Sequence, residues 1–202
     1  MHKIFFLSIL LLFFTSLSAS ENQYSIRGVY GWSSVKDLGD ILFGDVDPDH
    51  KEYKLYSVDA GKLLYSNVNK WPIDLYAKAG FVYYNENNFE DCYGADVYIK
   101  AFWNLDFLDN RVRLGLGEGL SYTTRLLQIE ELDAELKTSP TSKFLNYLDL
   151  SIDFDLGKLI GSKPLEELYL GVVMKHRSGI FGTFSGVHGG SNYNSIYLEK
   201  NF

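Results

Sequence analysis

The sequence predicts an all-β protein, an eight-stranded antiparallel up-and-down β-barrel that crosses a membrane. Three observations lead to this fold class. Aromatic residues make up 16% of the chain. Stretch after stretch alternates between apolar and polar side chains, which is the period of a β-strand. After the first twenty residues, no segment approaches the roughly 18 apolar residues of a membrane-spanning helix. A closed barrel is the other structure that can cross a bilayer.

The first twenty residues, MHKIFFLSILLLFFTSLSAS, have the pattern of a secretory signal peptide. A short basic start precedes an apolar run from Ile4 to Phe14, and small residues follow, with Ser18 and Ser20 placed for cleavage. The apolar run is too short for a bilayer helix. We therefore expect residues 1–20 to be a leader and residues 21–202 to form one barrel domain.

Alternation places the strands in the remaining chain. In the clearest strand, Leu148, Leu150 and Ile152 share one face, whereas Asp149 and Asp153 share the other. Such aspartates suit a polar barrel interior, with the aliphatic face turned to lipid. A soluble lipocalin-like barrel or sandwich is the alternative, and it would bury the aliphatic faces instead. The expected strands cover 24–34, 53–65, 73–84, 95–105, 111–124, 145–156 and a C-terminal hairpin whose first strand begins near 168.

Short and long connections between these strands alternate along the chain. Those near Asn69, Leu108 and Ser162 are short, whereas the others include the long ones, and the only helix-like run lies in one of these, around Gln128 to Leu136. Outer-membrane barrels have short periplasmic turns and longer extracellular loops. The pattern therefore predicts that the protein lies in the outer membrane of a Gram-negative bacterium with both termini in the periplasm. The terminal Phe202 resembles the C-terminal aromatic residue of such barrels.

Composition narrows the function classes. The net charge of −7 and the lack of a basic block argue against nucleic acid as a partner. The single cysteine, Cys92, excludes an internal disulfide. Asp45, Asp47 and Asp49 have a calcium-like spacing but lack the glycine and distal glutamate of an EF-hand loop, so a solvated loop is the better interpretation. With no P-loop, Rossmann or zinc spacing either, we expect no metal site and no cofactor.

A histidine and a serine interrupt an apolar strand face near the C-terminus. Leu170, Val172 and Met174 share one face of the expected strand, and His176 and Ser178 continue that face. Polar side chains on a lipid-facing stripe are costly unless they function or reach the headgroup zone. A neutral imidazole can take a proton from a nearby serine hydroxyl, while a third polar group orients the ring. The pair would suit ester cleavage in a lipid, or it merely ends the strand at the interface.

The segment His176-Arg177-Ser178, at the end of the penultimate strand of a small barrel, resembles the lipid A 3-O-deacylase (PagL-like) family. That resemblance implies an eight-stranded outer-membrane barrel that hydrolyses an ester-linked acyl chain of lipid A. It also implies Ser178 as nucleophile and His176 as base, with a glutamate completing the triad. The chain departs from the family pattern, with Gly179 after the serine and Gly190 at the position of the glutamate. Asn192, two residues further along and on the same face of the last strand, is a candidate to orient the histidine in place of that glutamate.

Glu118 is a second candidate for the acid, because it interrupts the apolar run of Leu114, Leu116 and Leu120. It would lie two strands from His176, or a bulge among the neighbouring glycines would turn it inward. Gly186, Gly189 and Gly190 in the last loop are candidates for presenting backbone N–H groups to an oxyanion, although Gly-rich loops are common in hairpins. We expect lipopolysaccharide as the substrate and outer-membrane lipid as the surroundings, and the sequence leaves open whether the chain forms a homodimer.

The competing hypothesis is a non-catalytic small barrel of the OmpX or OmpW kind, for adhesion, membrane integrity or solute passage.

Overall fold

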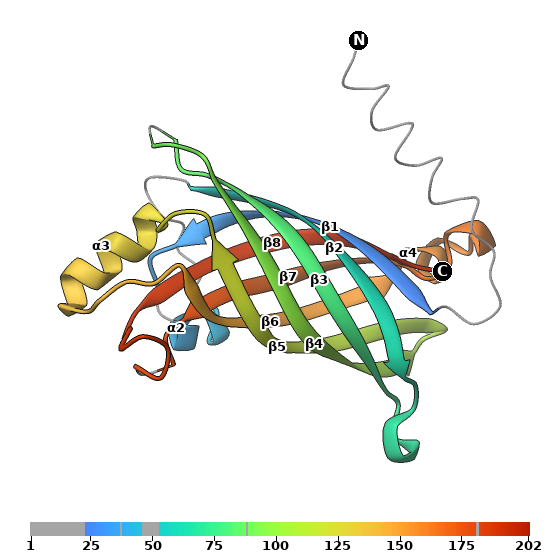
Figure 1. Ribbon diagram of the computed structural model, residues 1–202. Helices are drawn as coiled ribbons and strands as arrows, with labels where there is room; N and C mark the ends of the chain where they lie inside the picture. Colours follow the sequence, from blue (N-terminus) through green and yellow to red (C-terminus); the bar gives the residue numbers. More distant parts are fainter. Residues whose placement is uncertain (1–22, 37, 46–52, 88, 181) are drawn as a thin grey trace, which may run out of the picture.

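The computed structural model is an antiparallel β-barrel closed by pairing of the first and last strands (Figure 1). It describes residues 23–36, 38–45, 53–87, 89–180 and 182–202. Each strand pairs with the next one along the chain, and β8 pairs with β1. This is the predicted up-and-down topology, which leaves no unpaired sheet edge. The expected signal peptide, residues 1–20, lies outside the described residues.

The strands agree with the expected ranges to within a few residues. The largest difference is in β4, which begins at Cys92 and ends at Phe107 because pairing with β3 and β5 continues beyond the alternating core of the strand. The strands are β1 (Tyr24–Ser34), β2 (Lys54–Tyr65), β3 (Ile73–Asn85), β4 (Cys92–Phe107), β5 (Asn110–Thr123), β6 (Phe144–Asp155), β7 (Leu168–Ser178) and β8 (Gly190–Asn201). The short helices are α2 (Leu38–Leu42), α3 (Gln128–Lys137), α4 (Leu156–Ile160) and the 3₁₀ turns Val68–Lys70 and Lys163–Leu165.

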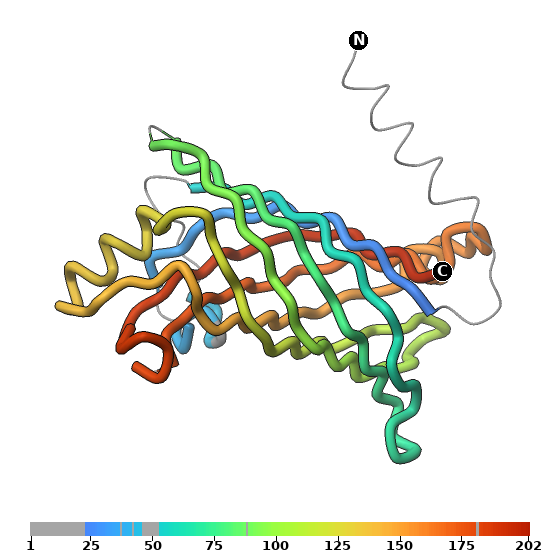
Figure 2. The backbone as a smooth tube through the Cα atoms, viewed as in Figure 1, coloured from blue at the N-terminus to red at the C-terminus, as the bar shows by residue number. Residues whose placement is uncertain are grey.

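The barrel has two distinct ends. Both chain termini of the barrel lie at one of them, where Tyr24 and Phe202 exchange backbone hydrogen bonds of 2.9 Å. We call this the terminal end, and the opposite one, where α3 lies, the loop end (Figure 2). The terminal end has the tight connection 108–109 and the turn 66–72, whereas the loop end has the long connections 35–53 and 124–143. The predicted division into short turns and longer loops is therefore present.

One connection at the terminal end is longer than expected. Residues 156–167 carry α4, which begins where the Asp155 side chain accepts a hydrogen bond from the Lys158 N–H at 3.0 Å. The helix ends at Gly161, whose φ of 68° is the left-handed conformation common at helix C-termini. At the loop end, the expected helix appears as α3, Gln128–Lys137. Among the described residues, no helix has the length and apolar character needed to cross a bilayer.

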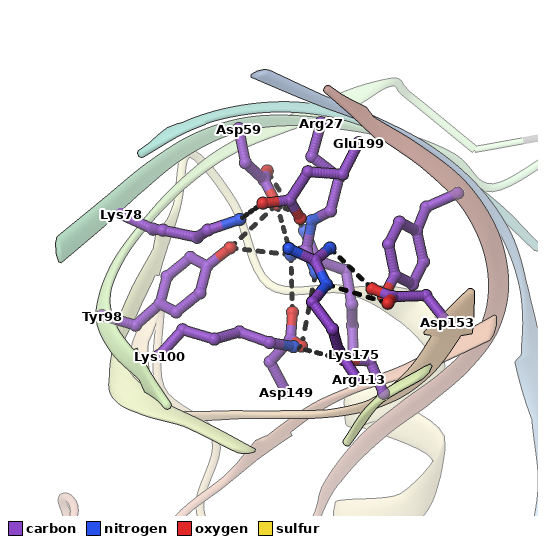
Figure 3. Close-up of polar contacts among 12 residues, drawn as sticks. Arg27, Asp59, Lys78, Tyr98, Lys100, Arg113, Asp149, Asp153, Lys175 and Glu199 are labelled. Carbon is purple, nitrogen blue, oxygen red and sulfur yellow. Dashed lines mark hydrogen bonds and ion pairs between the residues drawn. The ribbon is translucent and has the colours of Figure 1, made fainter. Parts of the chain in front are cut away.

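The lumen is polar and filled. Figure 3 shows Arg27 at its centre, between two aspartates that are fully buried. The Arg27 guanidinium donates to Asp59 Oδ2 at 2.5 Å and to Asp149 Oδ2 at 2.6 Å. Other pairs continue the network along the barrel: Lys78 with Glu199, Lys100 with Asp149, Arg113 with Asp153, and Lys175 with Asp96. A buried charge without a partner is very costly. Each of these charged side chains therefore needs its partner for the barrel to be stable.

The outward face is apolar, as the alternation predicts. Exposed aliphatic side chains come from β1, β2 and β4 to β8, among them Ile26, Val58, Val97, Ile99, Leu116, Ile152, Val172 and Ile196. A soluble barrel would place these side chains inside and the charges outside. The soluble lipocalin-like alternative is therefore wrong for this chain.

Candidate functional site

His176 and Ser178 lie on the outward face of β7, at the loop end. Their neighbours Lys175 and Arg177 point into the lumen and are 3% and 2% exposed, whereas the pair itself is half-buried. Strand alternation therefore puts the imidazole and the hydroxyl on the same side as Val172. This placement agrees with the expectation from the sequence.

Asn192 contacts His176 directly. The two residues are opposite each other in the β7–β8 register, and His176 Nδ1 lies 2.6 Å from Asn192 Oδ1. The other end of the Asn192 amide donates to the Lys36 backbone carbonyl at 2.8 Å. A carbonyl can only accept, so the Asn192 NH₂ group must face Lys36 and the amide oxygen must face the imidazole. His176 Nδ1 is then the donor, and the ring carries its lone pair on Nε2.

Glu118 lies on the outward face but apart from His176. The β5 register runs without a shift on both sides, so the bulge that would turn this carboxylate inward is not present. Leu148 is opposite both Glu118 and His176, so it separates them across the wall. Two strand spacings amount to about 10 Å. The structure thus brings Asn192, and not Glu118, into contact with the imidazole. Glu118 instead lines a separate outward hollow of about 670 Å³ over β1 to β5.

Helix α3 is held at the loop end by polar contacts with lumen-facing side chains of the barrel. Arg177 forms an ion pair with Glu130 at 3.0 Å, and the Ser191 hydroxyl donates to the same carboxylate at 2.8 Å. Burial raises the pKa of Glu130 above its usual value, while Arg177 acts in the opposite direction. Glu86 accepts a hydrogen bond from the Gln128 N–H at 2.7 Å and so caps the first turn.

The glycines of the last loop are less available than the sequence indicated. The Gly190 N–H donates to Asp133 of α3 at 3.1 Å, and the Gly186 N–H donates to the Gly182 carbonyl at 3.0 Å. The Gly179 N–H donates to the Gly189 carbonyl at 3.2 Å. These backbone donors are engaged within the fold, so they are poorly placed to receive an oxyanion.

Two features of the site have no counterpart in the sequence-based candidates. One is the Lys36 carbonyl, a backbone group that no side-chain pattern reveals. The other is Asn146, opposite Ser178 in the β6–β7 register and 6% exposed. The signal for Asn146 was present in the sequence, since it interrupts the outward series between Phe144 and Leu148 as Glu118 interrupts its own. The described residues contain no cluster of three or more His, Cys, Asp or Glu side chains that could hold a metal ion.

Comparison with known proteins supports the fold. No protein family model matches the sequence. The outer-membrane enzyme PagL has a similar crystal structure, with a TM-score of 0.57 at 10% sequence identity, covering 88% of this chain and 99% of that one. Neisserial surface protein A has a TM-score of 0.50 at 9% identity, covering 92% of this chain and 100% of that one. At these identities the likeness shows a shared fold, the eight-stranded barrel of outer-membrane proteins.

One curated protein is similar in sequence over part of the chain. It is a probable beta-glucosidase H of Emericella nidulans, 32% identical over 115 residues. The match covers 56% of this chain and 12% of that protein. Because the chain spans so small a part of the larger protein, the match does not place it in that family.

Proposed function

We propose that this chain is an outer-membrane barrel that hydrolyses an ester-linked acyl chain of lipid A by a serine–histidine mechanism. The observation that carries the proposal is the 2.6 Å contact between His176 Nδ1 and Asn192 Oδ1 beside Ser178, on the wall of the barrel rather than in its lumen. The barrel shared with PagL and the resemblance of the His176-Arg177-Ser178 segment support the same function.

The outer surface supports the membrane part of the proposal. Near the loop end, Tyr30, Tyr56, Tyr83 and Tyr93 form a continuous row of rings with centroids 5.2, 6.0 and 5.5 Å apart. At the terminal end, the exposed aromatic residues include Tyr65, Trp71 and Phe107. Aromatic girdles at both edges of an apolar band are typical of barrels embedded in a bilayer. A site at the level of the aromatic girdle near the loop end would meet the headgroups and ester bonds of the outer leaflet.

In the proposed mechanism, Ser178 Oγ attacks the ester carbonyl and His176 Nε2 takes its proton. The same nitrogen then protonates the departing alcohol, and water hydrolyses the acyl-enzyme by the reverse proton transfers. Residues two apart on a strand have parallel side chains about 7 Å apart at Cα, a separation that an imidazole can bridge. Asn192 is a positioning residue: its amide oxygen holds the ring in the tautomer that the reaction needs. As a neutral group it does not stabilise the imidazolium by charge.

The test is to express wild type and Ser178→Ala in a lipid A-bearing host and to weigh the lipid A by mass spectrometry. The proposal predicts the loss of one hydroxyacyl chain with wild type and none with the variant. Ser66→Ala, at an exposed turn of the terminal end, is the matched control and should behave as wild type. Heat-modifiable migration in gels shows that each protein has folded. Unchanged lipid A with folded wild type would favour the non-catalytic barrel; for such a barrel, the filled lumen argues against solute passage.

A further inference from the structure

Ester hydrolysis at Ser178 needs a hydrogen-bond donor for the charge that develops on the carbonyl oxygen. Removing one such donor from a hydrolase typically lowers kcat by about 10²–10³-fold, so its identity matters. The backbone N–H groups of Gly179, Gly186 and Gly190 are already paired within the fold. A side-chain donor near Ser178 Oγ is therefore the next kind of group to look for.

Asn146 meets the positional requirement. It lies on β6 directly opposite Ser178, and opposed residues of an antiparallel pair have Cβ atoms about 4.5–5.5 Å apart. Its neighbours Leu145 and Tyr147 are each 1% exposed and face the lumen, so the Asn146 side chain is on the outward face with the hydroxyl. From this position an amide NH₂ group reaches the space next to Ser178 Oγ.

The Asn146 amide is not used within the fold. Its side chain is 6% exposed, and within the described part of the chain its amide has no hydrogen-bond partner. The amide is not among the fully buried unpaired groups, so its N–H stays within reach of a substrate. The β7–β8 loop lies beside this end of β6, where the Phe184 and Phe144 ring centroids are 6.1 Å apart. A donor that is mostly shielded from water interacts more strongly with a charge that forms beside it than a fully solvated donor does.

We propose that the Asn146 side-chain amide is the oxyanion donor of this site, a role that rests on the esterase function proposed above. As the bond from Ser178 Oγ to the carbonyl carbon forms, the carbonyl π electrons move to its oxygen, and the proton of Oγ passes to His176. Asn146 Nδ2–H donates to that oxygen until the carbonyl re-forms and the bond between the carbonyl carbon and the alkoxy oxygen breaks. The alcohol leaves with the proton from His176.

The experiment compares Asn146→Ala and Asn146→Asp with wild type, using p-nitrophenyl esters in detergent micelles. Asp has the shape of Asn without the N–H donor, so it also answers the question if the Ala variant fails to fold. Both variants should lose about 10²–10³-fold in kcat with little change in KM, because the interaction forms only in the transition state. Reaction of Ser178 with a fluorophosphonate probe should slow in parallel, since the probe's phosphoryl oxygen occupies the oxyanion position. Asn194→Ala, an asparagine on the same wall opposite Met174, is the matched control.

The outcomes separate the two proposals. If Ser178→Ala is inactive while both Asn146 variants keep kcat within about threefold of wild type, Asn146 is not the donor and the esterase function stands. If wild type fails to hydrolyse the esters, or Ser178→Ala hydrolyses them as wild type does, the esterase function fails and this inference fails with it. A rise in KM at constant kcat would also overturn it, since that result indicates ground-state binding.

Discussion

Replacing Arg27 with Met tests the account of the lumen most directly. Arg27 is fully buried and contacts two aspartates that are also fully buried, Asp59 and Asp149. Met preserves most of the side-chain length but removes the charge and its donors. Among the described residues, Asp149 then pairs with Lys100, and Asp59 pairs with Lys175 at 3.5 Å, which is shared with Asp96 at 3.4 Å. The lumen is left with one uncompensated carboxylate.

The expected cost follows from that excess charge. Breaking a buried ion pair by removing one partner typically destabilises a protein by about 3–5 kcal/mol. We expect the free energy of unfolding of Arg27→Met, measured by guanidinium titration in detergent micelles, to fall by about this amount. Arg111→Met is the matched control, because Arg111 pairs at 2.8 Å with an Asp106 that is 64% exposed. Exposed pairs contribute about 0–1 kcal/mol, so the control should unfold nearly as wild type does.

A second variant identifies the cause of the loss. Adding Asp149→Asn to Arg27→Met removes the excess carboxylate, so the double variant should recover part of the stability lost by the single one. If Arg27→Met destabilised the barrel no more than Arg111→Met, the central pairs would not hold the lumen together and the reasoning would be wrong. The same conclusion would follow if the double variant lost as much free energy of unfolding as the two single variants lose together.

Three further predictions concern the loop end. Asn192→Ala should lower ester hydrolysis by about 10²-fold or more without unfolding the barrel, because the His176 tautomer is no longer fixed; equal rates in both proteins would refute the positioning role. Glu118→Gln should leave hydrolysis within about twofold of wild type, and a loss comparable to that of Ser178→Ala would show that the acid reaches the imidazole after all. The pKa of Glu130 is raised by burial above its usual value of 4.5, so the folded state holds this proton more tightly than the unfolded state does. The docking of α3 should therefore be strongest below about pH 4.5 and weaken as the pH rises through the raised pKa, and α3 amide exchange in Glu130→Gln should lack this pH dependence.

Much of the barrel could be predicted from single strands. The run from Leu145 to Leu156 alternates so regularly that its aliphatic face and its aspartate face were separable before any pairing was known. Strand β7 likewise placed His176 and Ser178 on one side. The boundaries of β4 and the helix α4 were missed, because strand ends depend on neighbouring strands and α4 on a local cap at Asp155.

The sequence by itself therefore determined the fold class and the face on which each side chain lies, because alternation is a local property of an extended chain. Only the tertiary structure decided which strands lie opposite one another, and hence that Asn192 meets the imidazole while Leu148 keeps Glu118 away from it. Register across a closed barrel is fixed by pairing between residues far apart in the chain, and so is the partner of every charge in the lumen. For this reason the sequence left open whether Asn192 or Glu118 lies beside the imidazole.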